Sequence, residues 1–275
     1  MASNESPFFD VVIENQVATI QVLNSSSREE LREHGGSIHW EYAKLLNDLR
    51  TDNGVRVVVI TGVKDGEFWV PPLANAQQSK TSKRLRSNSG ALWKTFTGIT
   101  IAHQAMAEME KPIVARVNGD AVGTGASVLF NSDLSVAVET AIIADHHMSM
   151  GELPKWATAF GMVPGDGGLA LAPLHMSPMK VKEFLMLAKP YTAREFADQG
   201  IINYAVEREE LDEVTDDIVR RLLRRASYAL AWTKRVANRR LVEHMNLTLD
   251  AASAYELVNF LTHEFLDEGS KQVLD

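Results

Sequence analysis

The sequence contains no cysteine, which excludes several kinds of site at once. Disulfide bonds, thiolate nucleophiles, zinc–cysteine centres and iron–sulfur clusters all require cysteine side chains. No stretch approaches the roughly 20 consecutive apolar residues of a membrane-spanning helix, and the N-terminus lacks the basic segment and apolar run of a signal peptide. We therefore expect a soluble, cytoplasmic protein without a membrane partner.

Positive charge is also in short supply. There are 28 lysines and arginines against 36 aspartates and glutamates, so the formal net charge is −8. An acidic chain is not attracted as a whole to nucleic acid or to anionic membranes, and we expect neither as a partner. The 275 residues are 45% hydrophobic and 23% charged. These values are typical of a globular protein that can bury a large core without disulfide or metal staples.

Three short apolar runs rich in β-branched residues are typical of strands buried on both faces: residues 55–61, 112–118 and 134–138. Apolar and polar residues alternate over residues 11–22, which predicts a strand or a hairpin. Residues 37–50 carry the apolar stripe of a helix.

From Leu211 onward almost every segment has a helical pattern. In the preceding part, strands separated by helical stretches indicate parallel pairing and an α/β fold class. We therefore expect an α/β core over residues 1–205 and a helical C-terminal region over residues 206–275, without a flexible linker between them.

Two glycine-rich turns are candidates for chemistry. The first, residues 117–126, leads from a buried strand into a helix, where free backbone N–H groups can hold developing negative charge. The second, residues 161–168, places Asp166 among glycines. Each has an ordinary alternative, which is a plain tight turn for the first and an aspartate bonded to its own backbone for the second.

Several histidines and one late glutamate complete the candidate side chains. Asp145 precedes His146 and His147, and a histidine near a carboxylate can act as a general base at neutral pH. Because adjacent side chains point different ways, we expect only one of the two histidines to face a site. No metal-binding spacing such as HExxH is present, so we expect no metal. On their helical patterns alone, His39 would be a core histidine and Glu256 a solvent-exposed residue.

Taken in order, five segments resemble the crotonase superfamily, also called the enoyl-CoA hydratase/isomerase family, over about residues 11–266. They are VRVVVITG (55–62), GEFWV (66–70), PIVARVNG with AVG (112–123), GMVPGDGG (161–168) and TAREFADQGIIN (192–203). The resemblance implies a crotonase-like ββα superhelical core and C-terminal helices that assemble a homotrimer or a dimer of trimers. It also implies an oxyanion hole formed by the backbone N–H groups of Val70 and Thr124, with Trp69 beside them in the substrate site.

The sequence departs from the hydratases of that family at both catalytic glutamates. Ser127 stands where the first glutamate follows the glycine-rich turn, and Ala157 stands at the second position, within an insertion over residues 149–158. The first oxyanion segment continues into Pro71 and Pro72, and proline has no N–H to donate. Hydratase chemistry, which needs both carboxylates, is therefore not favoured.

A closer resemblance is to the β-diketone hydrolase branch, typified by 6-oxocamphor hydrolase, which breaks carbon–carbon bonds without coenzyme A. Its matching positions are a histidine in the early helix, an aspartate in the Pro-Gly-Asp-Gly turn, a glutamate in the last helix and a histidine before the turn. Here these are His39, Asp166, Glu256 and either His146 or His147. A further histidine of that branch, at the first glycine-rich turn, is replaced here by Thr124.

This branch implies retro-Claisen hydrolysis of a 1,3-diketone, with cyclic substrates favoured. A histidine paired with Asp166 would deprotonate a water molecule that attacks one carbonyl, and the enolate of the other ketone would leave. Backbone N–H groups and His39 would stabilise the negative charges. Such a reaction needs no metal or organic cofactor.

Two other functions remain open. The first is an acyl-CoA hydratase, isomerase or hydrolase, since the basic residues within 74–90 and 220–240 could bind phosphates. The second is a catalytically silent scaffold that keeps only the fold and the subunit interface.

Overall fold

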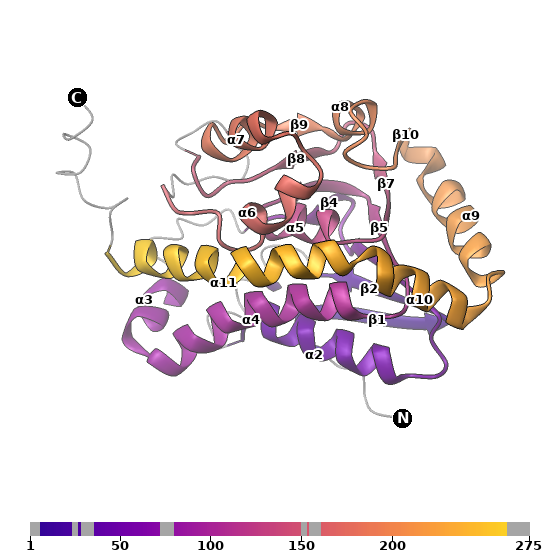
Figure 1. The fold of residues 1–275 in the computed structure, drawn as a ribbon, viewed down its shortest axis with the longest axis horizontal. Helices are drawn as coiled ribbons and strands as arrows, with labels where there is room; N and C mark the ends of the chain where they lie inside the picture. The colour runs from indigo at the N-terminus through magenta and orange to yellow at the C-terminus, as the bar shows by residue number, and fades with distance from the viewer. Residues whose placement is uncertain are drawn as a thin grey trace.

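The computed structural model describes residues 6–23, 27–28, 36–71, 80–149, 153 and 161–262, with residues 80–82 described by their main chain only (Figure 1). Within these residues the chain forms two sheets flanked by helices, a mixed α/β architecture as the sequence predicts. Among the described helices, none combines the length and apolar character that a membrane crossing requires.

The larger sheet has the strand order β1-β2-β3-β5-β7-β10. Its strands are β1 (Phe9–Glu14), β2 (Val17–Val22), β3 (Val57–Gly62), β5 (Ile113–Val117), β7 (Leu134–Val138) and β10 (Tyr204–Val206). All neighbours pair in parallel except β1 and β2. These two form a hairpin because Asn15 and Gln16, between them, both take positive φ angles (49° and 69°), as a tight two-residue hairpin turn requires.

The smaller sheet has the order β4-β6-β8-β9, with β4 (Gly66–Trp69), β6 (Gly119–Val122), β8 (Ile142–Ala144) and β9 (Tyr191–Thr192). Each of β3, β5 and β7 runs directly into a strand of this second sheet, so the pairs β3–β4, β5–β6 and β7–β8 repeat one unit. The parallel pairing of β4, β6 and β8 brings their carboxyl ends to one edge. Ligands bind preferentially at this edge of parallel sheets.

The helices begin with α2 (Ile38–Thr51), α3 (Lys80–Ser87), α4 (Ser89–Glu108), α5 (Thr124–Phe130) and α6 (Gly168–Leu171). They continue with α7 (Pro178–Met186), α8 (Ala193–Asp198), α9 (Leu211–Leu223), α10 (Ser227–Ala237) and α11 (Arg239–Thr262). The long helix α11 lies across the molecule beside α4, and α2 lies on the other side of α4 (Figure 1).

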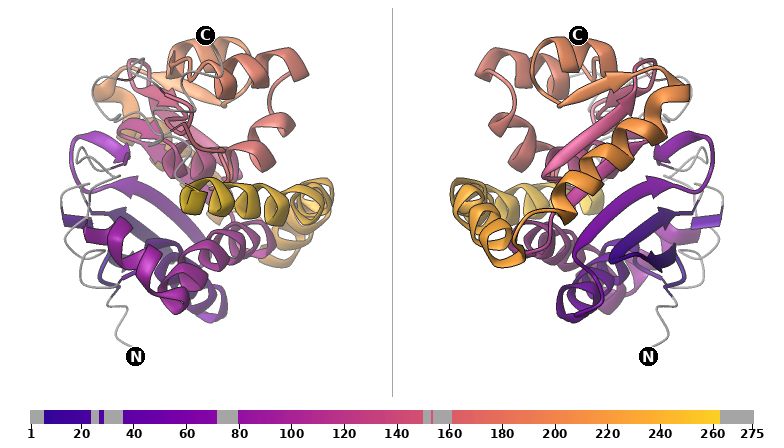
Figure 2. Two further views of the ribbon diagram at one scale, coloured as in Figure 1. Left: turned by 90° about the vertical axis from the view of Figure 1, so that its left-hand side faces the viewer. Right: turned by 90° about the vertical axis from the view of Figure 1, so that its right-hand side faces the viewer.

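Helix α11 packs against the core, and this packing places residues of α11 near the strand ends of the smaller sheet. The helix contacts both α4 and α6. Near its end, Arg86 donates a hydrogen bond to the Phe260 carbonyl (2.9 Å) and lies over the Phe260 ring. Asn259 accepts a hydrogen bond from Val163 N–H, 3.1 Å away. The first contact holds the end of α11 against α3, and the second holds it against the loop that precedes α6. Figure 2 shows α11, in yellow, lying beside α4 in magenta.

Candidate active site

Three strand ends of the smaller sheet form the floor of the site. Beyond β6, Gly123 donates its N–H to the Ala144 carbonyl at the end of β8 (2.9 Å). The end of β4 lies against α5. A Cβ on Gly125 would lie 1.9 Å from the Trp69 carbonyl oxygen, so only glycine allows this close approach. Val70 and Thr124 therefore follow adjacent strand ends, with Val70 buried and Thr124 opening α5.

A buried imidazole, that of His147, lies among three carboxylates. Its Nδ1 is 2.9 Å from Asp145 Oδ1, which also accepts the backbone N–H of His147 at 2.9 Å. Its Nε2 lies 3.8 Å from Asp166 Oδ2 and 3.8 Å from Glu256 Oε1. We name His147, Asp145, Asp166 and Glu256 the carboxylate–histidine cluster.

Asp166 is held in this cluster by the start of α5. Thr124 Oγ1 donates a hydrogen bond to Asp166 Oδ2 at 2.8 Å. The other oxygen, Oδ1, is buried and receives no hydrogen bond from any residue within the described ranges. A buried carboxylate oxygen that accepts no hydrogen bond lowers the stability of the folded protein. A hydrogen bond from a water molecule or a substrate to this oxygen would remove that cost.

Charge and burial set the protonation of the cluster. Burial opposes the charged form of His147, but Asp166, Asp145 and Glu256 outweigh it and raise the pKa of His147 to about 10. Burial likewise raises the pKa of Asp166, only partly offset by the His147 cation. For Asp145, the attraction of His147 outweighs burial and lowers the pKa. At neutral pH His147 therefore carries a proton, and Asp166 is a stronger base than an ordinary aspartate.

The raised pKa of His147 predicts a dependence of stability on pH. A folded-state pKa near 10, against an ordinary 6.5, means full stabilisation below about pH 6.5 and its loss as the pH rises through 10. We expect the difference in unfolding free energy between wild type and His147→Gln to shrink by roughly 2–4 kcal/mol from pH 6 to pH 10. Urea unfolding at both pH values measures it, and an unchanged difference would contradict the charged state of His147.

The two adjacent histidines lie just beyond β8, with ring centroids 4.4 Å apart. The expectation that only one of them faces the site stays a prediction. His147 faces the carboxylates, whereas the His146 ring packs over Gly123.

Gly123 is required by two separate features. Its φ is +61°, and a Cβ would lie 2.5 Å from the His146 ring. Gly200 offers a matched control, since its φ is +69° but nothing lies within 4 Å of a Cβ there. We expect Gly123→Ala to lower the unfolding free energy by about 1–3 kcal/mol more than Gly200→Ala, because only the former adds a clash to backbone strain. Equal losses in urea unfolding would contradict this.

Sequence patterns placed the other candidates with mixed success. The helical pattern around Glu256 predicts a solvent-exposed residue, and this is wrong. Glu256 is 7% exposed, and its carboxylate lies 3.8 Å from His147 Nε2. His39 is half-buried on α2, against Gly98 of α4, and its part in catalysis stays a prediction. Ala157, the second glutamate position of the hydratases, lies outside the described residues.

Asp145, which the sequence places beside the two histidines, is the direct partner of His147. One further residue of the site was missed by sequence reasoning. His103 on α4 is 1% exposed, and its Nε2 lies 2.8 Å from the Asp166 backbone carbonyl. Nothing in the sequence around His103 distinguishes it from a residue of an ordinary apolar helix.

Within the described part of the chain, one group of side chains could hold a metal ion. The ligand atoms of Asp145, His146 and His147 all lie within 4.8 Å of one another. However, His147 Nδ1 is already bonded to Asp145, and the carboxylates favour a protonated ring. Because a metal needs a neutral imidazole, this arrangement fits a proton better than an ion.

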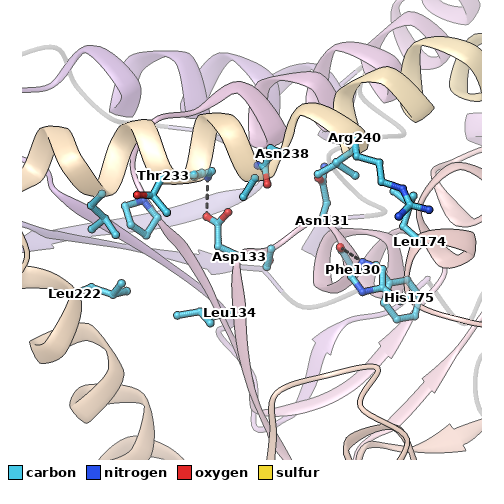
Figure 3. Close-up of a pocket in the computed structure, with 16 residues that line it drawn as sticks. Phe130, Asn131, Asp133, Leu134, Leu174, His175, Leu222, Thr233, Asn238 and Arg240 are labelled. Carbon is cyan, nitrogen blue, oxygen red and sulfur yellow. Dashed lines mark hydrogen bonds and ion pairs between the residues drawn. The ribbon is translucent and has the colours of Figure 1, made fainter.

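A separate pocket of about 420 Å³ lies between the N-terminal starts of β5 and β7 and the helices α10 and α11 (Figure 3). Half of its 16 lining residues are apolar, among them Leu134, Leu174 and Leu222. At its centre Asp133 forms an ion pair with Lys234 of α10, at 2.7 Å. The pocket is distinct from the carboxylate–histidine cluster, none of whose four residues lines it.

Comparison with known proteins agrees with the architecture. The family model described as enoyl-CoA hydratase/isomerase matches residues 13–271. Crotonyl-CoA hydratase from Syntrophomonas wolfei is 27% identical over 216 residues, which cover 78% of this chain and 75% of the relative. Carnitinyl-CoA dehydratase from Salmonella enteritidis is 28% identical over 189 residues, 69% of this chain and 66% of the relative.

Solved structures show the same fold. An enoyl-CoA hydratase/isomerase from Mycobacterium paratuberculosis has a TM-score of 0.78 at 24% identity, covering 98% of this chain and 97% of its own. A β-diketone hydrolase from the cyanobacterium Anabaena, bound to (S)-3-oxocyclohexyl acetic acid, has a TM-score of 0.75 at 20% identity, covering 94% and 96%. At these identities the likeness concerns the fold alone.

Proposed function

The chain belongs to the enoyl-CoA hydratase/isomerase family, and within it we propose a hydrolase that cleaves a carbon–carbon bond of a cyclic 1,3-diketone by a retro-Claisen reaction. The observation that carries the proposal is the pairing of Asp166 and Glu256 around one buried imidazole, with Asp166 Oδ1 left open for a donor. A carboxylate base beside an open hydrogen-bonding position is what the activation of a water molecule requires.

In the proposed reaction Asp166 is the base. The three carboxylates raise the pKa of His147 and favour its protonated ring, so we assign the base to Asp166 rather than to the histidine of the sequence-based hypothesis. Asp166, with its raised pKa, takes the proton while the water oxygen bonds to one carbonyl carbon. The tetrahedral oxyanion then collapses, the carbon–carbon bond breaks, and the expelled enolate is protonated from the cluster. Water and a cyclic diketone thus give one keto acid.

Both negative charges need donors. We assign this role to the backbone N–H groups of Val70 and Thr124, with Trp69 lining the substrate site and His39 as a polar partner. The burial of Val70 and Trp69 supports the assignment, because donors act more strongly where water is excluded. Each well-placed donor typically contributes about 3 kcal/mol to lowering the barrier.

The nature of residue 127 argues against standard hydratase chemistry. Ser127, at the position of the first hydratase glutamate, is 1% exposed within α5. A serine hydroxyl does not exchange a proton near neutral pH as a carboxylate does. Hydration of an enoyl thioester would thus lack one of its two acid–base groups.

The experiment is a spectrophotometric assay of the purified full-length protein with cyclic 1,3-diketones of several ring sizes and no added coenzyme A. We expect loss of the enolate absorbance and one keto acid formed per diketone consumed. No turnover of any ring size would overturn the proposal.

An acyl-CoA enzyme is the second candidate, favoured by the names of the curated relatives. Several basic side chains that could meet phosphates are, however, engaged elsewhere. Arg86 bonds Phe260, Lys234 pairs with Asp133, and Arg220 pairs with Asp217. Stabilisation of the protein by coenzyme A in a thermal-shift assay would favour this candidate. Intact folding without turnover of diketones or thioesters would favour a silent scaffold.

We also propose that the protein assembles as a homotrimer or a dimer of trimers. One face of α10 supports this, because Tyr228, Trp232 and Val236, four residues apart, are 77%, 65% and 69% exposed. Apolar stripes of this kind are usually covered by a partner. Light scattering should give three or six times the 30.5 kDa of one chain, and a monomer would contradict the proposal.

A further inference from the structure

Asp166 is bonded at its backbone as well as at its side chain. His103 Nε2 lies 2.8 Å from the Asp166 carbonyl oxygen, and Thr124 Oγ1 donates to the Asp166 carboxylate. His103 is 1% exposed on α4, and its Nε2 fills the space where Gly167 would carry a Cβ. The ring therefore packs directly under the turn that carries Asp166.

Asn131 determines which nitrogen of His103 carries the proton. Its Nδ2 lies 3.0 Å from the His103 carbonyl and 3.3 Å from His103 Nδ1. A carbonyl oxygen can only accept, so the amide must present its NH₂ group to both atoms. His103 Nδ1 is then an acceptor, and in the neutral ring the single proton lies on Nε2. That proton is donated to the Asp166 carbonyl.

We propose that His103 and Asn131 are positioning residues that hold Asp166 in reach of His147, an inference that rests on the proposed role of Asp166. Asn131 selects the tautomer, His103 anchors the backbone of Asp166, and Thr124 orients its carboxylate. Both side chains are buried, with His103 1% and Asn131 3% exposed. A displacement of about 1 Å in a catalytic group can cost on the order of 10²-fold in rate, so an anchor of this kind matters.

The burial of His103 supports a neutral ring. Burial lowers its pKa, so the cationic form is disfavoured even beside the Asp166 carbonyl. A neutral ring has one donor and one acceptor, which is what the two neighbours demand.

Two substitutions separate the anchor from simple packing. In His103→Gln the side-chain amide can replace the Nε2 donor, whereas in His103→Asn the shorter amide reaches only the Nδ1 position. We expect His103→Gln to keep kcat within about threefold, and His103→Asn to lower kcat by about 10- to 100-fold. KM should stay within about threefold in both, because binding groups are untouched.

His175 supplies a control for this type of contact. Its Nε2 likewise contacts a backbone carbonyl, that of Phe130 at 2.7 Å, although the residue itself is exposed. His175→Gln and His175→Asn should both leave kcat unchanged. A loss of kcat in His175→Asn equal to that in His103→Asn would assign the effect to general packing and overturn the proposal.

Two NMR measurements test the proposal without activity. Ring nitrogen shifts of the wild type should show protonated Nε2 and unprotonated Nδ1 for His103. The pKa of His147, which faces Asp145, Asp166, Glu256 and the His146 ring, should fall in His103→Asn but not in His103→Gln. The opposite tautomer, or equal His147 pKa values, would overturn the inference.

The outcomes also separate this inference from the proposed function. If the wild type hydrates crotonyl-CoA but does not cleave diketones, the proposed function fails, and the same kcat comparison is made with crotonyl-CoA. If neither substrate is turned over, the tautomer and the pKa of His147 decide the positioning role.

Discussion

Replacement of Asp166 by asparagine is expected to lower kcat for diketone cleavage by about 10³-fold, in the range typical of a lost general base. Asparagine matches the shape of aspartate and can still accept the Thr124 hydroxyl at 2.8 Å. It cannot take a proton from water, and it removes a charge that raises the pKa of His147. Steady-state kinetics and an NMR titration of His147 measure the two effects.

Asp120 provides the control for this substitution. Its carboxylate accepts the Ile142 backbone N–H at 2.8 Å, so it too is a bonded aspartate of the smaller sheet. We expect Asp120→Asn to leave kcat within about threefold, because it removes no group from the carboxylate–histidine cluster. Near wild-type turnover in Asp166→Asn would refute the role of Asp166 as base.

Replacement of Lys234 by methionine is expected to lower the unfolding free energy by about 3–5 kcal/mol, the usual cost of leaving a buried charge unpaired. Lys234 Nζ lies 2.7 Å from Asp133 Oδ2 and donates to the Lys111 carbonyl at 3.0 Å. Its side chain is 6% exposed. Burial raises the pKa of Asp133 despite the lysine, and after the substitution the Ile113 N–H, at 2.7 Å, and the Asn238 side chain would still bond the carboxylate without neutralising its charge.

Two further variants make this prediction specific. The double variant Asp133→Asn with Lys234→Met should recover part of the loss, because no unpaired charge remains. Arg220→Met removes an exposed cation 3.0 Å from Asp217 and should cost no more than about 0.5 kcal/mol. Urea unfolding measures all three. If Lys234→Met and Arg220→Met lower the unfolding free energy by the same small amount, the buried ion pair stabilises the protein no more than an exposed pair does, and the prediction is wrong.

Local sequence patterns were sufficient for many elements. The apolar runs predicted β3, β5 and β7, since a strand covered on both faces needs apolar residues at every position. Thr192 and Glu195 start α8 with a capping box whose two hydrogen bonds are both present, a signal contained in four consecutive residues. Helix α4 was not predicted, because α2 and α11 both pack on it and its apolar residues do not follow one stripe.

The family and the kinds of candidate residue could be read along the chain, because motifs and turn chemistry are local properties of the sequence. The meeting of His147 with Asp145, Asp166 and Glu256 could not, since Glu256 lies far along the chain from His147 and reaches it only through the packing of α11. The same holds for His103, whose bond to Asp166 depends on how α4 crosses beneath a distant turn. The protonation states of His147 and Asp166 also depend on this packing, because the pKa of a group is set by its burial and by the charges near it in space.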